Sequence, residues 1–329
     1  MDKTDGTPAS LTEAIRYFSD HDTCQAFLVA LRWPNGITCP RCGAGDPLYL
    51  ANQRRWKCRS KHARQQFSVK VKTIFEDSPL GLDKWLPAVW MIVNDKNGIS
   101  SYEVGRALGI TQKSAWFMLH RVRLAMQRGS LGKFSGEVEV DETFIGGKAR
   151  NMHAWKRRVV VKGSGPFGSG KAAVVGVLER SAEKGKSKVQ LTVIDNIRTG
   201  TLDRHVRDRV ERGADIYTDA LASYRKLGDE YSHRTVDHAV QYAEGKVHTN
   251  GLENFWSLLK RCLKGTYVSV EPFHLFRYLD EEAFRFNERK DPRGDAGRFV
   301  QVLATIVGRR LTYKALTGKL GPQLATTPA

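Results

Sequence analysis

The sequence predicts an α/β domain with a central mixed sheet flanked by helices, preceded by two smaller modules. Three observations lead to this fold class. Residues 36–75 are rich in turns and carry three of the five cysteines, residues 80–127 show helical periodicity, and from residue 137 strand-like and helix-like segments follow one another. The expected parts are an N-terminal helical segment (1–35), a cysteine-bearing module (36–75), a helical module (80–127), the α/β domain (137–290) and a basic C-terminal tail (291–329).

The composition favours a soluble globular protein with a polyanionic partner. The chain has 329 residues, of which 41% are hydrophobic and 27% charged, so it has room for several domains. It has no run of about 18 apolar residues and no N-terminal secretory pattern, so neither a membrane span nor a signal peptide is expected. The net charge of +18 indicates a partner such as nucleic acid, although a generally basic surface is the alternative.

The cysteine-bearing module has the spacing of a zinc ribbon. Cys39 and Cys42 form a CxxC pair, and Cys58 follows after 15 intervening residues. His62 follows after three more and is the candidate fourth ligand, because thiolates and an imidazole suit tetrahedral zinc. Three free thiols that cluster by chance are the alternative. The spacing therefore predicts one structural zinc ion.

The helical module contains a candidate helix-turn-helix. Ser100 and Glu103 are placed to form a capping box, which would open a helix that runs to Leu108. Gly109 suits the turn, and Thr111 suits the N-cap of the next helix.

In a helix-turn-helix the start of the second helix enters the major groove of DNA. We therefore expect Gln112, Lys113 and Ser114 to be exposed there, and Arg121 and Arg123 to contact phosphates. An ordinary helical hairpin is the alternative. The neighbouring zinc module and the basic charge of the chain favour DNA binding.

The α/β domain is predicted from the order of its strands and helices. Its expected elements are a strand ending at Asp141, strands at 172–178 and 188–194, a helix at 202–212, a strand at 215–218, a helix at 221–227, a strand near 234–236 and a helix that carries Glu253. This order favours a mixed sheet flanked by helices, as in ribonuclease-H-like folds. Asp141 and Asp219 would then end adjacent strands, and Glu253 would reach in from the helix.

Three carboxylates make this domain a candidate phosphoryl-transfer enzyme. Asp141 and Asp219 each close a strand, and Glu253 and Lys260 lie seven residues apart on one helical face. Carboxylates delivered in this way can hold two Mg²⁺ or Mn²⁺ ions, which activate an attacking oxygen and stabilise a leaving one. Each position also has a structural interpretation: an Asp after a strand starts turns, and Asn250 with Glu253 fits a capping box in which Asn250 is the N-cap.

Two further polar features have weaker signals. The irregular spacing of His233, His238 and His248 favours a phosphate contact or a surface role over a transition-metal site. The basic stretch at 148–171 lacks a helical stripe and is either a DNA-contacting loop or a solvated segment.

Several motifs together resemble those of bacterial insertion-sequence transposases with an N-terminal zinc ribbon and a DDE-type catalytic domain. The motifs are CPRC, WKCRSKH, QFSV, IFEDSPLGLDKW, VEVDETFIGGK, YTDALASY, HTNGLENFWSLLKR, GTY and FRYLDEEAFRFNER. They span roughly residues 36–290, which is most of the chain.

The resemblance implies a ribonuclease-H-like fold, divalent-metal catalysis and DNA transposition by cutting and joining at element ends. By position, Asp141, Asp219 and Glu253 would be the metal ligands, and Lys260 would contact DNA near the reaction. Asn250 is an alternative third catalytic residue, because some relatives use an asparagine.

The resemblance also implies partners and a location. The expected partners are the terminal inverted repeats and the target DNA, both double-stranded, and a homo-oligomer on DNA is expected because two ends must be joined. The expected location is the bacterial cytoplasm, in association with the nucleoid. A non-catalytic DNA-binding regulator derived from a transposase and a ribonuclease-H-like nuclease without strand transfer are the alternatives.

Overall fold

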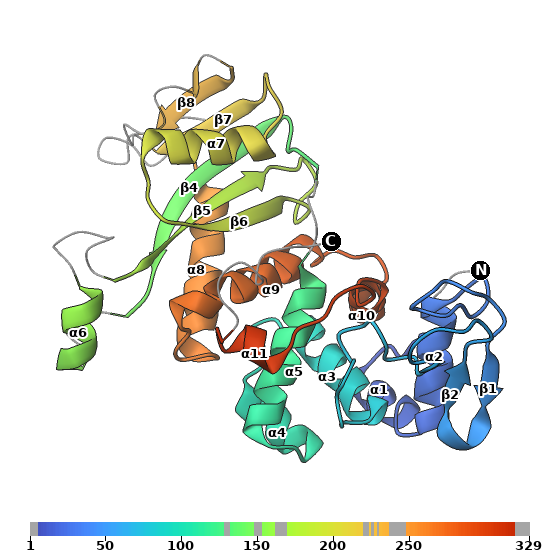
Figure 1. Ribbon diagram of the computed structural model, residues 1–329. Helices are drawn as coiled ribbons and strands as arrows, with labels where there is room; N and C mark the ends of the chain where they lie inside the picture. The colour runs from blue at the N-terminus through green and yellow to red at the C-terminus, as the bar shows by residue number, and fades with distance from the viewer. Residues whose placement is uncertain are drawn as a thin grey trace. The chain divides into compact units, whose positions relative to one another are not determined.

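The computed structural model describes residues 6–127, 132–147, 153–161, 170–219, 224, 227–228, 230–236 and 248–319. The chain divides into two compact units (Figure 1). Unit 1 is Met1–Met126 with Asp291–Ala329, and unit 2 is Gln127–Lys290. Within the described ranges, no helix is both long enough and apolar enough to span a membrane. Most of the helix expected at 221–227, and much of the basic stretch at 148–171, lie outside the described residues.

Unit 1 begins with two helices where the sequence showed one helical stretch. These are α1 (Leu11–Tyr17) and α2 (His21–Arg32). The side chains of Ser10 and Asp20 cap them by accepting hydrogen bonds from backbone amides three residues further on. Because Asp20 offers this cap, the chain starts a new helix instead of continuing the first.

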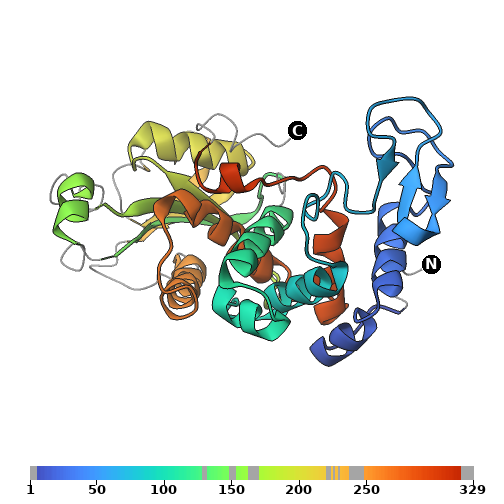
Figure 2. The ribbon, with the colours of Figure 1, turned by 60° about the horizontal axis from the view of Figure 1, so that its bottom comes forward.

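A small antiparallel sheet forms the predicted ribbon. It consists of β1 (Leu48–Leu50), β2 (Arg55–Lys57) and β3 (Gln66–Phe67), with a 3₁₀ turn, η1 (Ala51–Gln53), between the first two strands. Figure 2 shows these short strands in light blue. Trp56 and Phe67 are buried and stack with ring centroids 5.9 Å apart. So small an apolar core needs support from elsewhere, such as a bound metal.

Helices complete unit 1, including two from the segment expected as a C-terminal tail. They are α3 (Leu82–Asn94), α4 (Ser101–Leu108), α5 (Gln112–Met126), α10 (Gly294–Ala304) and α11 (Tyr313–Leu316). Phe299 of α10 is fully buried against Trp90 of α3 and Phe18. Thr305 donates a 2.6 Å hydrogen bond to the carbonyl of Ala125 at the end of α5. Residues 291–319 are therefore part of unit 1, and α10 contributes to its core.

Unit 2 is built on a five-stranded mixed sheet with the order β6-β5-β4-β7-β8. The strands are β4 (Glu137–Ile145), β5 (Ala172–Glu179), β6 (Lys188–Ile194), β7 (Asp215–Asp219) and β8 (Ser232–Val236). β5 runs antiparallel to both β4 and β6, whereas β4, β7 and β8 are parallel. The predicted mixed sheet is confirmed.

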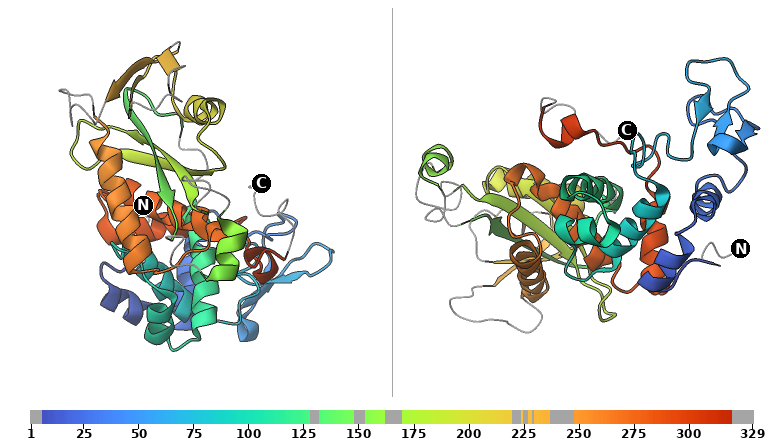
Figure 3. Two further views of the ribbon diagram at one scale, coloured as in Figure 1. Left: turned by 90° about the vertical axis from the view of Figure 1, so that its left-hand side faces the viewer. Right: turned by 90° about the horizontal axis from the view of Figure 1, so that it is seen from below.

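Helices cover both faces of this sheet (Figures 1 and 3). They are α7 (Thr199–Arg209) on one face and α8 (Asn250–Gly265) and α9 (Leu275–Asn287) on the other, with α6 (Ala154–Val160) and the 3₁₀ turn η4 (Pro272–His274) in connections. Val138 and Val140 of β4 lie in the core beneath α7. Because side chains alternate along a strand, Glu139 and Asp141 point to the face that carries α8.

Candidate active site

The four predicted zinc ligands meet in the ribbon. One ligand atom from each of Cys39, Cys42, Cys58 and His62 lies within 4.8 Å of the other three. Cys39 Sγ is 3.5 Å from His62 Nε2, and Cys42 Sγ is 3.5 Å from Cys58 Sγ. Three thiols and an imidazole at this spacing fit a tetrahedral zinc ion. The structure thus brings His62 into the group as the sequence predicted.

Backbone groups prepare two of these side chains for a metal. Burial raises the pKa of the Cys39 thiol, but hydrogen bonds from the backbone amides of Arg41 and Cys42 and from the thiols of Cys42 and Cys58 outweigh burial and lower that pKa to about 6. His62 Nδ1 donates to the carbonyl of Ala63 at 2.8 Å, which leaves Nε2 free to bind zinc. Cys39 is then available as a thiolate and His62 as the correct tautomer.

The helix pair α4–α5 has the caps that the sequence predicted. Ser100 and Glu103 form the capping box, and Gly109 ends α4 with a left-handed φ of 63°. Thr111 Oγ1 accepts a 3.2 Å hydrogen bond from the amide of Ser114, so it caps α5. These contacts confirm the two helices and the turn between them.

At the start of α5 the candidate DNA-contacting side chains differ in availability. Lys113 is exposed, with its ammonium 5.1 Å from the centre of the Tyr313 ring. Gln112 Nε2 donates to Ser101 Oγ at 2.8 Å, and Ser114 is partly buried. Lys113 is therefore the most accessible of the three.

The expected phosphate contacts of Arg121 and Arg123 are wrong for this structure. Their exposed fractions are 5% and 1%. The Arg121 guanidinium donates to the carbonyls of Ile74, Glu76 and Leu311, at 3.0, 2.8 and 3.1 Å. The C-terminal segment and α3 pack around α5, so Arg121 joins distant segments of unit 1 and Arg123 is enclosed in its core.

Asp141 and Asp219 lie at the same level on adjacent strands. In the parallel pair β4–β7, Glu139 is opposite Tyr217, and each aspartate lies two residues further along its strand. Both aspartates are partly buried, whereas Glu253, in the first turn of α8, is exposed. The predicted adjacency of the two strands is confirmed. The expectation that the first strand ends at Asp141 is wrong, because β4 continues to Ile145 through its pairing with β5.

The surroundings of Asp141 link the three carboxylates. Burial raises its pKa to about 6, a hydrogen bond from Trp256 opposes this rise, and the negative charges of Asp219 and Glu253 add to it. Trp256 Nε1 donates to Asp141 Oδ2 at 2.8 Å, and the backbone amide of Glu142 donates to Oδ1 at 2.8 Å. Both oxygens of Asp141 are therefore oriented by hydrogen bonds, and the charges of both other carboxylates raise the pKa of Asp141.

A glycine on β5 makes room for Trp256. A Cβ atom at Gly176 would lie 2.7 Å from the Trp256 ring, which is closer than real side chains approach. The indole can therefore reach Asp141 only because β5 carries no side chain at this point.

The carboxylates are less tightly grouped than the zinc ligands. Among the residues that the structure describes, Asp141, Asp219 and Glu253 do not form a group whose ligand atoms are close enough to share a single ion, as the zinc ligands do. In a two-metal site each carboxylate needs to reach only one of two ions, which lie about 3.5–4 Å apart. The wider spacing is compatible with such a site.

The start of α8 differs from the prediction. Thr249 occupies the N-cap position, and Asn250 is the first residue of the helix. The capping box expected from Asn250 and Glu253 is therefore wrong, because the helix starts one residue too early for it. Thr249 Oγ1 lies 3.4 Å from Glu253 Oε1. Lys260, two turns further on, is partly exposed.

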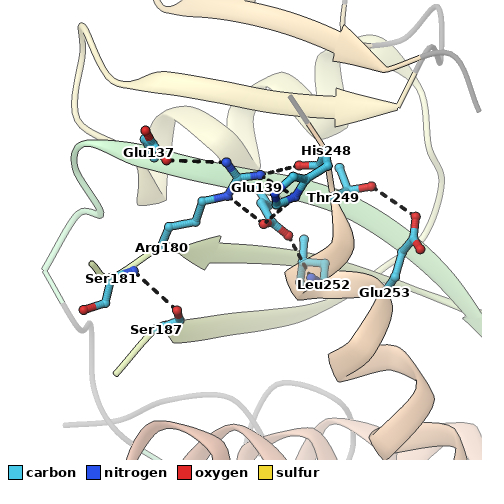
Figure 4. Close-up of polar contacts among 9 residues, drawn as sticks. All are labelled: Glu137, Glu139, Arg180, Ser181, Ser187, His248, Thr249, Leu252 and Glu253. Atoms are coloured by element: carbon cyan, nitrogen blue, oxygen red, sulfur yellow. Dashed lines mark hydrogen bonds and ion pairs between the residues drawn. The ribbon is translucent and has the colours of Figure 1, made fainter. Parts of the chain in front are cut away.

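A buried ion pair that the sequence did not predict fixes this end of α8 (Figure 4). Glu139 of β4 is 1% exposed, accepts from the backbone amide of Leu252 at 2.8 Å and accepts from Arg180 Nε at 2.7 Å. Arg180 also reaches Glu137 at 3.4 Å and the ring and carbonyl of His248. The contacts join β4 and the end of β5 to the first turn of α8, the turn that carries Glu253.

Glu142 is a second carboxylate whose importance the sequence did not reveal. The hydroxyl of Tyr224 donates to Glu142 Oε2 at 2.6 Å. Burial raises the pKa of Glu142 to about 7, and the charges of Asp219 and Asp141 act in the same direction. The only signal in the sequence was its position directly after Asp141.

A hollow of about 810 Å³ opens beside the Glu139–Arg180 pair. Its lining includes Arg180, His248, Asn254 and Arg289. It therefore brings basic and polar groups close to the first turn of α8.

Comparison with known proteins identifies the class to which these two parts belong. Residues 133–287 match the family model of the ISXO2-like transposase domain, and residues 19–62 match that of the transposase zinc-ribbon domain. The first match covers β4 to α9 and thus all three candidate carboxylates, and the second contains all four zinc ligands.

Two curated proteins are similar over most of their own length. One is an uncharacterised protein in transposable element ISH50 of Halobacterium salinarum, 25% identical over 260 residues that cover 76% of this chain and 85% of the relative. The other is an uncharacterised transposase-like protein of Haemophilus influenzae, 35% identical over 103 residues that cover 31% of this chain and 83% of the relative. The chain belongs to the transposase family of insertion sequences.

Proposed function

We propose that the protein is a metal-dependent DNA transposase whose catalytic carboxylates are Asp141, Asp219 and Glu253. The observation that carries the proposal is their placement: Asp141 and Asp219 lie at the same level on the adjacent parallel strands β4 and β7, and Trp256, three residues after Glu253 on α8, donates a 2.8 Å hydrogen bond to Asp141 Oδ2. The three come from β4, β7 and α8 of a chain in a transposase family. A mixed sheet with helices on both faces also supports a ribonuclease-H-like fold for this domain.

The donor chemistry fits Mg²⁺ or Mn²⁺, which prefer hard oxygen ligands. Burial and two neighbouring negative charges disfavour the ionised form of Asp141, and a nearby cation would favour it. Trp256 and the amide of Glu142 already orient its two oxygens. When bound, two such ions supply activation of the attacking oxygen and stabilisation of the leaving one.

The reaction we infer is hydrolysis of a phosphodiester at an element end, followed by in-line attack of the freed 3′-hydroxyl on target DNA. Lys260 lies two turns after Glu253 on α8, which would place its ammonium near the reacting strand. The hollow lined by Arg180 and Arg289, together with Glu137 and Glu139, borders the first turn of α8, the turn that carries Glu253. We assign end recognition to the zinc ribbon and to the start of α5, where Lys113 is exposed.

Partners and assembly follow from this reaction. Both element ends and the target are double-stranded DNA, and the net charge of +18 suits such a partner. Because two ends must be joined, we expect a homo-oligomer on DNA.

The first experiment compares Asp141→Ala and Asp219→Ala with Asp195→Ala, an exposed aspartate of the same unit. We expect the first two variants to lose metal-dependent cleavage of an end substrate while end binding in a gel shift stays near that of the unmutated chain. Asp195→Ala should retain both properties. Cleavage retained in either active-site variant would overturn the two-metal assignment.

The same assay separates a transposase from the two alternatives, a non-catalytic DNA-binding regulator and a nuclease without strand transfer. A chain that binds ends but never cleaves in Mg²⁺ or Mn²⁺ would be a regulator. A chain that cleaves but cannot join a pre-cut end to target DNA would be a nuclease without strand transfer.

A further inference from the structure

The zinc ribbon carries the most basic short segment of the described chain. Residues 53–64, QRRWKCRSKHAR, contain six lysines and arginines and no acidic residue. The segment holds two of the four zinc-ligand side chains, Cys58 and His62, and the whole of β2. The charge is therefore attached to a framework that a metal would hold.

A hollow of about 440 Å³, called here the ribbon groove, lies beside this segment. Its cationic and amide lining residues are Arg41, Gln53, Arg54, Arg55, Arg64, Gln66 and Lys70. Two acidic residues, Glu76 and Asp77, also line it, and Arg310 forms ion pairs with both. With these acids neutralised, the groove presents a concave surface of positive charge.

Two of the groove arginines adopt a backbone conformation that favours glycine. Arg54 has a φ of 48° and Arg64 a φ of 58°, both in the left-handed region. An L side chain is strained in this region, whereas glycine is not. Arginine at both positions therefore costs stability, and this cost is understandable if the charged side chains serve a purpose in the groove.

A side chain between the two cysteines of the CxxC pair fixes the position of one side of the groove. Arg41, between Cys39 and Cys42, donates from one nitrogen to the carbonyls of Arg64 and Gln66 at 2.6 and 3.0 Å. The position of Arg64 is thus tied to the metal-binding turn.

The charges of Arg55 and Arg64 are available to a ligand. Both residues are exposed, and within the described part of the chain neither forms an ion pair or a side-chain hydrogen bond. Arg54 pairs with Asp22, but both side chains are more than half exposed, so water screens that pair.

We propose that the ribbon groove binds the sugar-phosphate backbone of double-stranded DNA, with Arg55 and Arg64 as direct phosphate contacts. The proposal rests on the proposed function, in which the N-terminal parts bind DNA. A projecting helix or ribbon reads base edges in the major groove, whereas a concave basic surface receives the projecting backbone. Guanidinium groups match phosphate oxygens through two parallel hydrogen bonds. The contact therefore supplies affinity and register and is independent of sequence.

The test uses the full chain with Arg55→Gln, Arg64→Gly and the double variant. Lys72→Gly is the matched control, because Lys72 is exposed, has a φ of 55° and does not line the groove. Binding is measured on an end duplex and on an unrelated duplex at several salt concentrations. Zinc content and the melting temperature are measured for every variant.

We expect the double variant to bind both duplexes roughly five- to tenfold more weakly, and its slope of log affinity against log salt to fall by about 0.9 for each lost contact. Arg64→Gly should keep its zinc and melt no lower than the unmutated chain, because its left-handed strain is relieved. Lys72→Gly should bind as the unmutated chain does.

Three results would overturn the proposal. Unchanged affinity and slope in the double variant would remove the groove from the interface. An equal loss in Lys72→Gly would show that any positive charge of this region serves as well. If the unmutated chain bound no DNA even at low salt, the DNA-binding part of the proposed function would fail together with the groove.

Discussion

At the scale of single residues, Glu253 and Asn250 compete for the role of third catalytic residue, and their chemistry differs. A charged carboxylate binds a hard dication more strongly than a neutral amide does. Glu253 acts on the pKa of Asp141, and Trp256, three residues later on α8, contacts Asp141 directly. We expect Glu253→Gln to lose metal-dependent cleavage and Asn250→Ala to retain it, measured at matched folded protein over a range of Mn²⁺ concentrations.

The stability of the two variants is the control for this comparison. Asn250 is exposed in the first turn of α8, so Asn250→Ala should change the free energy of unfolding by only about 0.5 kcal/mol or less. Normal cleavage by Glu253→Gln together with an inactive Asn250→Ala would reverse the two roles.

His62 provides the second prediction at this scale. The unmutated chain should bind one structural zinc ion, and His62→Ala should bind it more weakly, because three thiolates remain where four ligands close a structural site. Metal analysis after dialysis against a weak chelator measures the difference. His21→Ala, an exposed histidine of the same unit, is the control. Full zinc occupancy in His62→Ala would remove this residue from the ligand set.

Residue spacing predicted which side chains share a face, but not which face is buried. For the zinc ligands this was enough, because all four belong to one short segment. For Arg121 and Arg123 it was not, because the packing partners of α5 include Leu311, which is 190 residues away from Arg121 in the sequence. Local sequence patterns contain no information about packing partners that are so far away in the sequence.

At the scale of elements, the pair Glu139–Arg180 holds the first turn of α8 on the sheet, and its loss should be measurable. In Glu139→Ala, the amide of Leu252 loses its acceptor and the largely buried guanidinium of Arg180 loses its closest carboxylate. Breaking a buried pair costs about 3–5 kcal/mol, and we expect the lower end because Arg180 keeps Glu137. Urea unfolding gives this value.

The control for this prediction is Glu183→Ala, which removes one partner of the exposed pair Glu183–Lys186. Exposed pairs contribute little, so its effect should stay within about 0.5 kcal/mol. Equal effects of the two substitutions would show that Glu139 does not anchor α8.

The elements of unit 2 were largely predictable, but their anchoring contacts were not. Strand-like segments at 172–178 and 188–194 predicted β5 and β6, and helix-like segments at 202–212 and around Glu253 predicted α7 and α8. The contacts of Glu139 join it to residues 41 and 113 positions away. In unit 1, helix α10 was missed because its basic flanks obscured the apolar positions around Phe299, which pack only against distant helices.

At the scale of the whole molecule, the positive charge has two different uses. Some of it is structural, since Arg121, Arg180 and Arg285 are buried against carbonyls or carboxylates. The rest lies on the surface, and the arginines of the ribbon groove and Lys113 are examples. Only this exposed part can displace counterions from DNA.

The last prediction concerns the dependence of DNA binding on salt. Each phosphate that the protein neutralises releases counterions and adds about 0.9 to the negative slope of log affinity against log salt. A chain of net charge +18 should therefore bind an end duplex with a steep slope, lose affinity by orders of magnitude between about 50 and 200 mM salt, and recover it on dilution. Fluorescence anisotropy at constant pH and Mg²⁺ measures the slope, and the Asp141→Ala chain permits the measurement without cleavage of the duplex. The buried arginines set an upper limit on this slope, because they cannot reach phosphates while the fold is intact. A nearly flat dependence would show that the exposed charge serves a partner other than the DNA backbone.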